Sequence, residues 1–169
     1  MVDRERREGA AIALRRFLDY EIDNIEYENE YSNATLDGPF QRLFGKHRIE
    51  DRALRAISDF TWCFYDDFHA HKLDGEHALS EEALTIANRC ILFLKSEYEY
   101  EWHETSLLMV ESNFTPRGIL NLNPPPEFTP RTLTQHLSAL LRQPEGDASV
   151  WPFFRRSNYE LAMSSTTPG

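Results

Sequence analysis

The apolar residues between positions 80 and 98 recur at helical spacing, and this pattern constrains the fold more than any other feature of the sequence. They lie three or four positions apart, as on the buried face of an amphipathic helix. Ser80 is a suitable N-cap, and Glu81 and Glu82 match the positive end of the helix dipole. The sequence therefore predicts a helix that begins at Ser80. Its core-facing residues are expected to be Ala83, Ile86, Ala87, Cys90, Ile91, Leu94 and Tyr98.

Two further stretches have this period. From Arg4 to about Asn29 the pattern predicts one long helix, with arginines near its first turn and acids near its last. This order opposes the helix dipole, so helix stability does not explain it. A second helix is predicted from about Asp51, with Asp51 itself on a face away from the core. Its core-facing residues are expected to be Ala53, Ile57, Phe60, Phe64 and Phe68.

These patterns predict an all-α fold: a single-domain bundle of about five helices over residues 1–163, followed by a flexible tail over 164–169. The helices beginning near Asp51 and Ser80 are expected to pack as an antiparallel pair. Residues 105–128 lose the helical period, which favours a small β-hairpin or an irregular segment. The other predicted elements are a short helix over residues 39–44, a helix from Thr129, and a last short helix that begins at Trp151-Pro152 and carries Phe153, Phe154, Tyr159 and Leu161.

Composition narrows the classes of partner. The formal net charge of −10 disfavours direct binding to nucleic acid or to an anionic membrane, because both reward a basic face. A basic protein is the better-matched partner. No apolar stretch is long enough to span a membrane, and we therefore expect a cytoplasmic protein. In that reducing compartment Cys63 and Cys90 are expected to be buried and unpaired.

Catalytic motifs are missing from the sequence. No nucleophile turn, phosphate-binding loop or zinc-protease pattern occurs, which argues against an enzyme, and no cofactor is predicted. The densest polar cluster consists of Asp66, Asp67, His69 and His71. On a helix these residues would form two carboxylate–histidine pairs, and such pairs can bind zinc or iron, with Glu97 or Glu101 as a further ligand. The alternative is the solvated end of a helix.

The most unusual stretch runs from Asp19 to Tyr31 and contains six acids and three tyrosines, but no lysine or arginine. Acids steer a basic partner, and tyrosine provides amphipathic contact area. Equally, the tyrosines could cover the edge of the core beside a solvated acidic face. On the first interpretation, the partner-binding residues are Asp19, Tyr20, Glu21, Asp23, Glu26, Tyr27, Glu28, Glu30 and Tyr31.

The leading functional hypothesis is a non-catalytic protein–protein interaction module, of the immunity or inhibitor type, that binds a basic partner through the acidic, tyrosine-rich stretch. In its small size, acidity and helical pattern the chain resembles bacterial immunity proteins, which neutralise a cognate toxin. One alternative is a helical metal-binding protein or metalloenzyme that uses the Asp66–His71 cluster. Another is a structural subunit of a larger assembly that exposes Trp151, Phe153 and Phe154, although docking of these aromatics on the bundle is the simpler expectation.

Overall fold

The computed structural model describes residues 2–35, 51–65, 68–103 and 145–166, and these residues form five α-helices and no strand. The all-α prediction is confirmed. The helices are α1 (Arg4–Leu18), α2 (Asn24–Thr35), α4 (Arg52–Thr61), α5 (Glu81–Leu94) and α8 (Arg156–Thr166). Three 3-10 turns accompany them: η1 (Trp62–Phe64), η2 (Gly75–His77) and η5 (Ala148–Val150). None of the described helices is long and apolar enough to cross a membrane.

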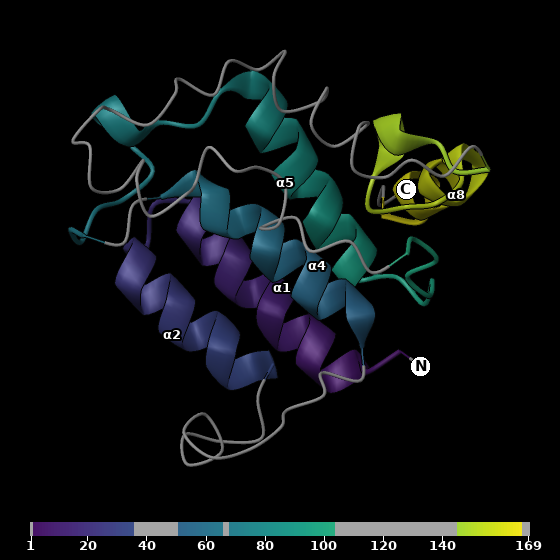
Figure 1. Cartoon of the computed structure of the whole chain (residues 1–169), viewed down its shortest axis with the longest axis horizontal. Helices are drawn as coiled ribbons and strands as arrows, with labels where there is room; N and C mark the ends of the chain where they lie inside the picture. Colours follow the sequence, from purple (N-terminus) through teal and green to yellow (C-terminus); the bar gives the residue numbers. More distant parts are fainter. Residues whose placement is uncertain (1, 36–50, 66–67, 104–144, 167–169) are drawn as a thin grey trace.

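Helix α1 is the centre of the bundle and packs against α2 and α5 (Figure 1). Figure 1 shows α2 running antiparallel to α1. Helices α4 and α5 contact each other and run in opposite directions, as the sequence predicts for that pair. Apart from Arg7, the buried residues of α1 are apolar, and Ala10, Leu14 and Phe17 are fully buried. Helix α8 lies beside α5 at one end of the bundle (Figure 1).

The single long helix predicted from Arg4 to Asn29 is wrong, because α1 ends at Leu18 and α2 begins only at Asn24. The Glu21 N–H donates to the Arg16 carbonyl at 2.9 Å, and the Tyr20 N–H donates to the Phe17 carbonyl at 3.2 Å. These two bonds form a Schellman motif, which ends a helix with one residue in the left-handed conformation. That residue is Tyr20, with φ +59°.

The break also explains the charge order that opposed a single dipole. Asp23 and Glu26 lie at the beginning of α2, where their carboxylates are favourable. The Asp23 carboxylate accepts from the Glu26 N–H at 2.8 Å, and the Glu26 carboxylate accepts from the Asp23 N–H at 3.2 Å. This reciprocal pair is a capping box, so helix stability does account for part of the acidic stretch.

Helices α1 and α2 approach closely at Gly9. A β-carbon built on Gly9 would lie 2.8 Å from the β-carbon of Ala34 in α2. No flexible side chain is available there to move aside, since both groups are held by helix backbone. Gly9 is therefore required by the packing of the two helices rather than by its backbone freedom.

Gly9→Ala is expected to lower the free energy of unfolding by about 1 kcal/mol, because overpacking outweighs the helix propensity that alanine adds. Urea denaturation followed by circular dichroism measures the change. In the double variant Gly9→Ala/Ala34→Gly the contact is relieved, and stability should return close to that of the unmodified protein. A single Gly9→Ala variant more stable than the parent would show that the two helices can separate without cost.

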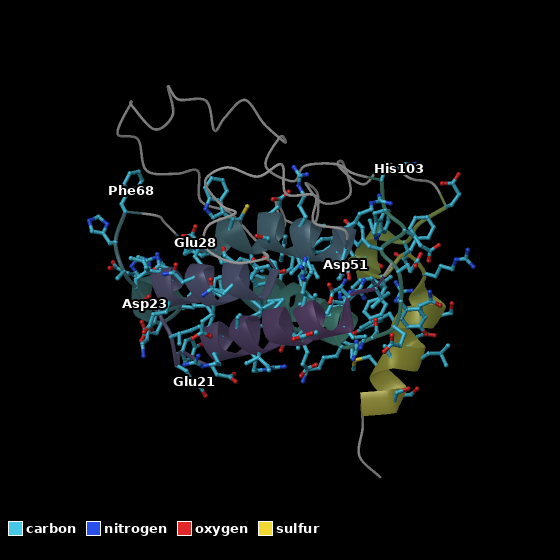
Figure 2. All side chains as sticks on the ribbon, turned by 90° about the horizontal axis from the view of Figure 1, so that it is seen from below. Glu21, Asp23, Glu28, Asp51, Phe68 and His103 are labelled. Carbon is cyan, nitrogen blue, oxygen red and sulfur yellow. The ribbon has the colours of Figure 1, made fainter. Side chains whose placement is uncertain are left out.

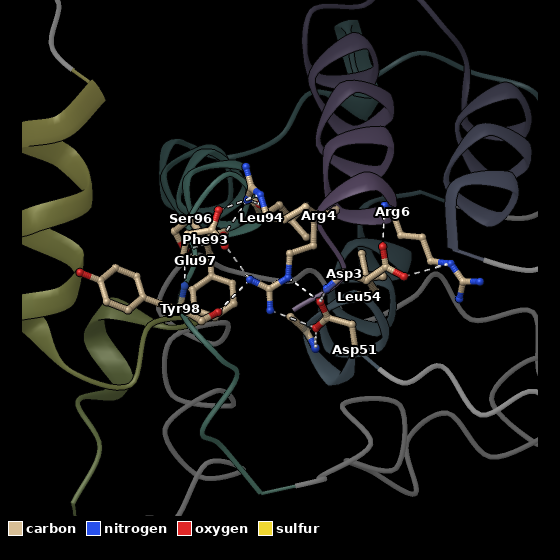
Figure 3. Close-up of polar contacts among 12 residues, drawn as sticks. Asp3, Arg4, Arg6, Asp51, Leu54, Phe93, Leu94, Ser96, Glu97 and Tyr98 are labelled. Atoms are coloured by element: carbon tan, nitrogen blue, oxygen red, sulfur yellow. Dashed lines mark hydrogen bonds and ion pairs between the residues drawn. The ribbon is translucent and has the colours of Figure 1, made fainter. Parts of the chain in front are cut away.

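A buried ion pair joins the N-termini of α1 and α4 (Figure 3). The Arg7 guanidinium donates to both oxygens of Asp51, at 2.6 Å and 3.0 Å, and the two side chains are 1% and 3% exposed. Asp51 also caps α4 by accepting from the Ala53 N–H at 3.1 Å, and it accepts from the Asp3 N–H at 3.0 Å. The prediction that Asp51 faces away from the core is therefore wrong.

Helix α5 begins as predicted. The Ser80 hydroxyl accepts from the Ala83 N–H at 3.2 Å, and the predicted apolar face is buried as far as Leu94. The helix ends there, and Tyr98 lies half-buried in the segment that follows. That segment is tied back to α1, because the Tyr98 carbonyl accepts from Arg7 at 2.8 Å.

The last helix begins later than predicted from the sequence. Trp151–Pro152 is a cis peptide that follows η5, and α8 begins only at Arg156. Trp151 and Phe153 are fully buried, so docking on the bundle is confirmed and the exposed aromatics expected of an assembly subunit are not found. Helix α8 runs to Thr166, so the first part of the predicted tail is helical. The helices expected over 39–44 and from Thr129, and the segment 105–128, lie outside the described residues.

Candidate functional site

Two of the three tyrosines in the acidic stretch belong to the core. Tyr27 is 2% exposed and stacks on Phe17 with ring centroids 4.6 Å apart, and its hydroxyl lies 2.7 Å from that of Thr61. Tyr31 is 3% exposed, and its hydroxyl donates to the Leu54 carbonyl at 2.9 Å. Burial raises the pKa of both phenols well above the ordinary value. Neither ring is on the surface, so Tyr27 and Tyr31 are not part of the exposed surface that a partner could contact in this structure.

The exposed part of the stretch combines acids with two apolar side chains. Tyr20, in the turn between α1 and α2, is 45% exposed, and Ile25, in the first turn of α2, is 48% exposed. Asp23 and Glu30 are partly exposed. We call the exposed set the α1–α2 surface; it consists of Asp19, Tyr20, Glu21, Ile25, Glu26 and Glu28. Figure 2 shows Glu21 and Asp23 projecting at one end of the bundle, opposite His103.

Arg16 and Lys72 partly neutralise this surface. The Lys72 ammonium donates to the Glu21 backbone carbonyl at 3.4 Å. Arg16, in the last turn of α1, forms ion pairs with Glu30 and, at 3.2 Å, with Glu21. The hydrogen bond with Glu30 and the contacts with Glu21 raise the pKa of Arg16. Asp19 and Glu28 have no ion pair within the part of the chain that the structure describes. The surface therefore keeps a net negative charge with unpaired carboxylates.

The structure joins the acidic stretch to the histidine cluster through Asn24, which is 1% exposed. The Asn24 side chain accepts from the His71 N–H at 2.8 Å and donates to the His69 carbonyl at 3.1 Å, while its backbone N–H donates to the His71 carbonyl at 3.0 Å. The loop that carries the histidines is thus held against the beginning of α2. Asn24 was not among the residues predicted to be functional, because an asparagine near the beginning of a helix gives no sign of burial in the sequence.

The predicted helical geometry of the metal cluster is not observed. Helix α4 ends at Thr61 and η1 at Phe64, so His69 and His71 lie in a loop, and Asp66 and Asp67 are outside the described residues. The helix that was expected to place carboxylates on the same face as these histidines does not extend as far as His69. Phe68, expected in the core, is 77% exposed. Among the residues that the structure describes, no group of three or more metal-binding side chains occurs.

Glu97 and Glu101 do not lie near the histidines. Glu97 pairs with Arg4 at 2.9 Å, at the beginning of α1, whereas His71 lies beside Asn24, beyond the end of α1. The 15-residue helix α1 separates the two ends by about 20 Å. Glu97 therefore cannot share a metal site with His71. Glu101 lies 4.0 Å from Arg155, the residue before α8.

The cysteines do not form a reactive pair. Cys90 is fully buried, as predicted, and desolvation raises the pKa of its thiol far above the ordinary value. Cys63, in η1, is exposed, so its predicted burial is wrong. Both thiols are free. A thiol with a raised pKa is a poor nucleophile at neutral pH, so Cys90 offers no catalytic chemistry.

The function of the α1–α2 surface is inferred from the chemistry of its own residues. No protein-family model, curated protein or solved structure matches the chain. The surface presents carboxylates around two exposed apolar side chains, Tyr20 and Ile25. Such a combination is suited to binding another protein, because apolar groups supply contact area and charged groups supply selectivity.

Proposed function

We propose that the protein is a non-catalytic protein-binding module that engages a basic partner protein through the α1–α2 surface. The observation that carries the proposal is the exposure of Tyr20 and Ile25 among the carboxylates of Asp19, Glu21 and Glu28. Other apolar side chains, such as Ile12 and Leu161, are also about half exposed, but Tyr20 and Ile25 lie within the acidic stretch, where solvation does not need them. An interface does need them, because its affinity comes from a few anchors within a polar rim.

The charges of this surface favour a partner with arginine or lysine around an apolar patch. Long-range attraction would speed the encounter. The carboxylates of Asp19 and Glu28, which form no ion pair among the described residues, would reject acidic proteins. Inhibitor and immunity proteins act in this way when they cover a basic face of an enzyme or toxin, and we propose that role here. We also propose a cytoplasmic location, since the two free thiols suit a reducing compartment.

Reversing the charge of Asp19 and Glu28 tests the proposal without disturbing the fold. Neither carboxylate takes part in the capping box or in the ion pairs of Arg16. In the variant Asp19→Lys/Glu28→Lys, partner capture is expected to fall about tenfold or more at low salt, because attraction becomes repulsion. Affinity capture with the immobilised protein, followed by mass spectrometry across a salt series, measures the change.

The matched control is Glu8→Lys/Glu160→Lys, which changes the net charge equally but on exposed faces of α1 and α8. Capture of the same basic protein should be nearly unchanged in this control. Equal capture by the charge-reversed and unmodified proteins would contradict the proposed surface. Equal losses in both variants would show that net charge alone drives the binding.

A further inference from the structure

Tyr20 occupies a position where a tyrosine costs stability. It is the residue that ends α1 in the left-handed conformation, with φ +59°, inside the Schellman motif. Glycine is usual there because it has no β-carbon to strain, and asparagine is the next most common choice. A bulky aromatic residue with positive φ is an outlier, and such outliers cluster at functional positions.

The fold gains little in return for this strain. The side chain of Tyr20 is 45% exposed. Within the described part of the chain, its ring and hydroxyl form no hydrogen bond, stacked ring contact or cation–π contact. The contrast with Tyr27 is direct, because Tyr27 is 2% exposed and stacks on Phe17. An outlier of this kind with few specific contacts of its own is a candidate for binding a partner.

We propose that Tyr20 is the anchor of the α1–α2 surface and that it receives an arginine side chain of the partner. This inference rests on the proposed function. Asp19 and Glu21 flank the exposed ring in the sequence, and both are themselves exposed. Glu21 already pairs with Arg16, so Asp19 is the flanking carboxylate that a partner's guanidinium would meet. A guanidinium can lie flat on an aromatic face while its N–H groups donate to neighbouring carboxylates. A lysine ammonium is more strongly hydrated and does not stack in this way.

The same surface already holds one guanidinium between carboxylates. Arg16 contacts both Glu21 and Glu30, so two acids of the acidic stretch converge on one arginine. Asp19 remains unpaired beside Tyr20 among the described residues. An arginine of the partner would form a second arrangement of this kind. Its guanidinium would pair with the Asp19 carboxylate and stack on the Tyr20 ring.

The first test concerns stability and needs no partner. Tyr20→Gly and Tyr20→Asn should raise the midpoint of urea denaturation, because both residues adopt positive φ more readily than tyrosine. Tyr20→Phe should leave the midpoint unchanged, since it keeps the ring and the strain. A lower midpoint for both Tyr20→Gly and Tyr20→Asn would show that the ring stabilises the fold, and would overturn the inference.

The second test uses two synthetic probes, a short arginine–glycine peptide and its lysine–glycine counterpart. In NMR titrations of the unmodified protein, the arginine peptide should bind about two- to fivefold tighter and shift the amide signals of residues 19–21. The preference should disappear in Tyr20→Gly and persist in Tyr20→Phe. Equal affinity for the two peptides, or a preference that survives Tyr20→Gly, would overturn the assignment of arginine to Tyr20.

The outcomes separate this inference from the function on which it rests. If Asp19→Lys/Glu28→Lys loses the captured partner but Tyr20→Gly binds both peptides as before, the surface is correct and the anchor is wrong. If the charge-reversed variant keeps the partner as well, the proposed function itself fails.

Discussion

Replacing Arg7 by alanine is expected to lower the free energy of unfolding by about 3–5 kcal/mol, because it leaves the Asp51 carboxylate buried without its counter-ion. The guanidinium also donates to the carbonyl of Tyr98 and lies 5.1 Å from the centroid of the Phe93 ring. Removing Arg7 therefore removes three contacts of α1. These are the contacts with Asp51 before α4, with the Tyr98 carbonyl after α5, and with the Phe93 ring in α5.

Urea denaturation followed by circular dichroism measures this change, and a double-mutant cycle with Asp51→Ala isolates the interaction between the two side chains. The double variant is expected to lose less than the two single losses added together, since neither charge is then left unpaired. It should not regain full stability, because Asp51 also caps α4. A loss below about 1 kcal/mol for Arg7→Ala would mean that water reaches the carboxylate and replaces the guanidinium.

Arg7→Lys is the matched control. The ammonium keeps the positive charge, but it cannot donate to both Asp51 oxygens and to the Tyr98 carbonyl in the planar geometry that the guanidinium provides. We expect its stability to fall between those of the unmodified protein and Arg7→Ala. Stability equal to that of the unmodified protein would show that charge alone, rather than the hydrogen-bond geometry, maintains the connection.

Replacing Tyr27 by alanine is the second substitution expected to have a large effect, with a loss of about 3–5 kcal/mol in the free energy of unfolding. The ring fills the contact between α1, α2 and α4, where it stacks on Phe17 and also lies against Tyr31 and Tyr65. Removing it opens a cavity between helices that the neighbouring rings cannot fill without moving. Thermal or urea denaturation measures the loss.

Tyr27→Phe separates the ring from the hydroxyl. The ring contacts persist, and Thr61 keeps its own hydrogen bonds to the Ile57 and Ser58 carbonyls, so the loss should stay near 1 kcal/mol. Partner capture by Tyr27→Phe should match that of the unmodified protein, because the residue is buried. Reduced capture with unchanged stability would show that the Tyr27 hydroxyl takes part in partner binding.

Local sequence signals located several elements correctly. The Ser80 N-cap and the apolar period that follows predicted α5, because a cap and one buried face are properties of a single helix. The alanine and phenylalanine pattern predicted the buried face of α4 for the same reason. It failed at Phe68, where the chain has already left the helix and the ring is exposed.

The end of α1 was missed because its usual sign is absent. A glycine near position 20 would have indicated the Schellman motif, but the chain has a tyrosine there, and the apolar period continues through Ile22 and Ile25. Once the helix is divided, the acids at Asp23 and Glu26 become an N-terminal capping box. The stretch predicted to bind a partner therefore contains both buried tyrosines and exposed carboxylates, and its role in binding remains a prediction.

The sequence by itself determined the helical class, the beginning of α5 and the acidic character of the stretch from Asp19 to Tyr31, since each depends on neighbouring residues alone. Only the tertiary structure decided which tyrosines of that stretch are buried, and that Asn24 holds the histidine loop. It also brought Arg7 and Asp51 together across 44 positions of sequence. The physical reason is that burial and pairing depend on which helices meet, and many arrangements of helices satisfy the same local periodicity.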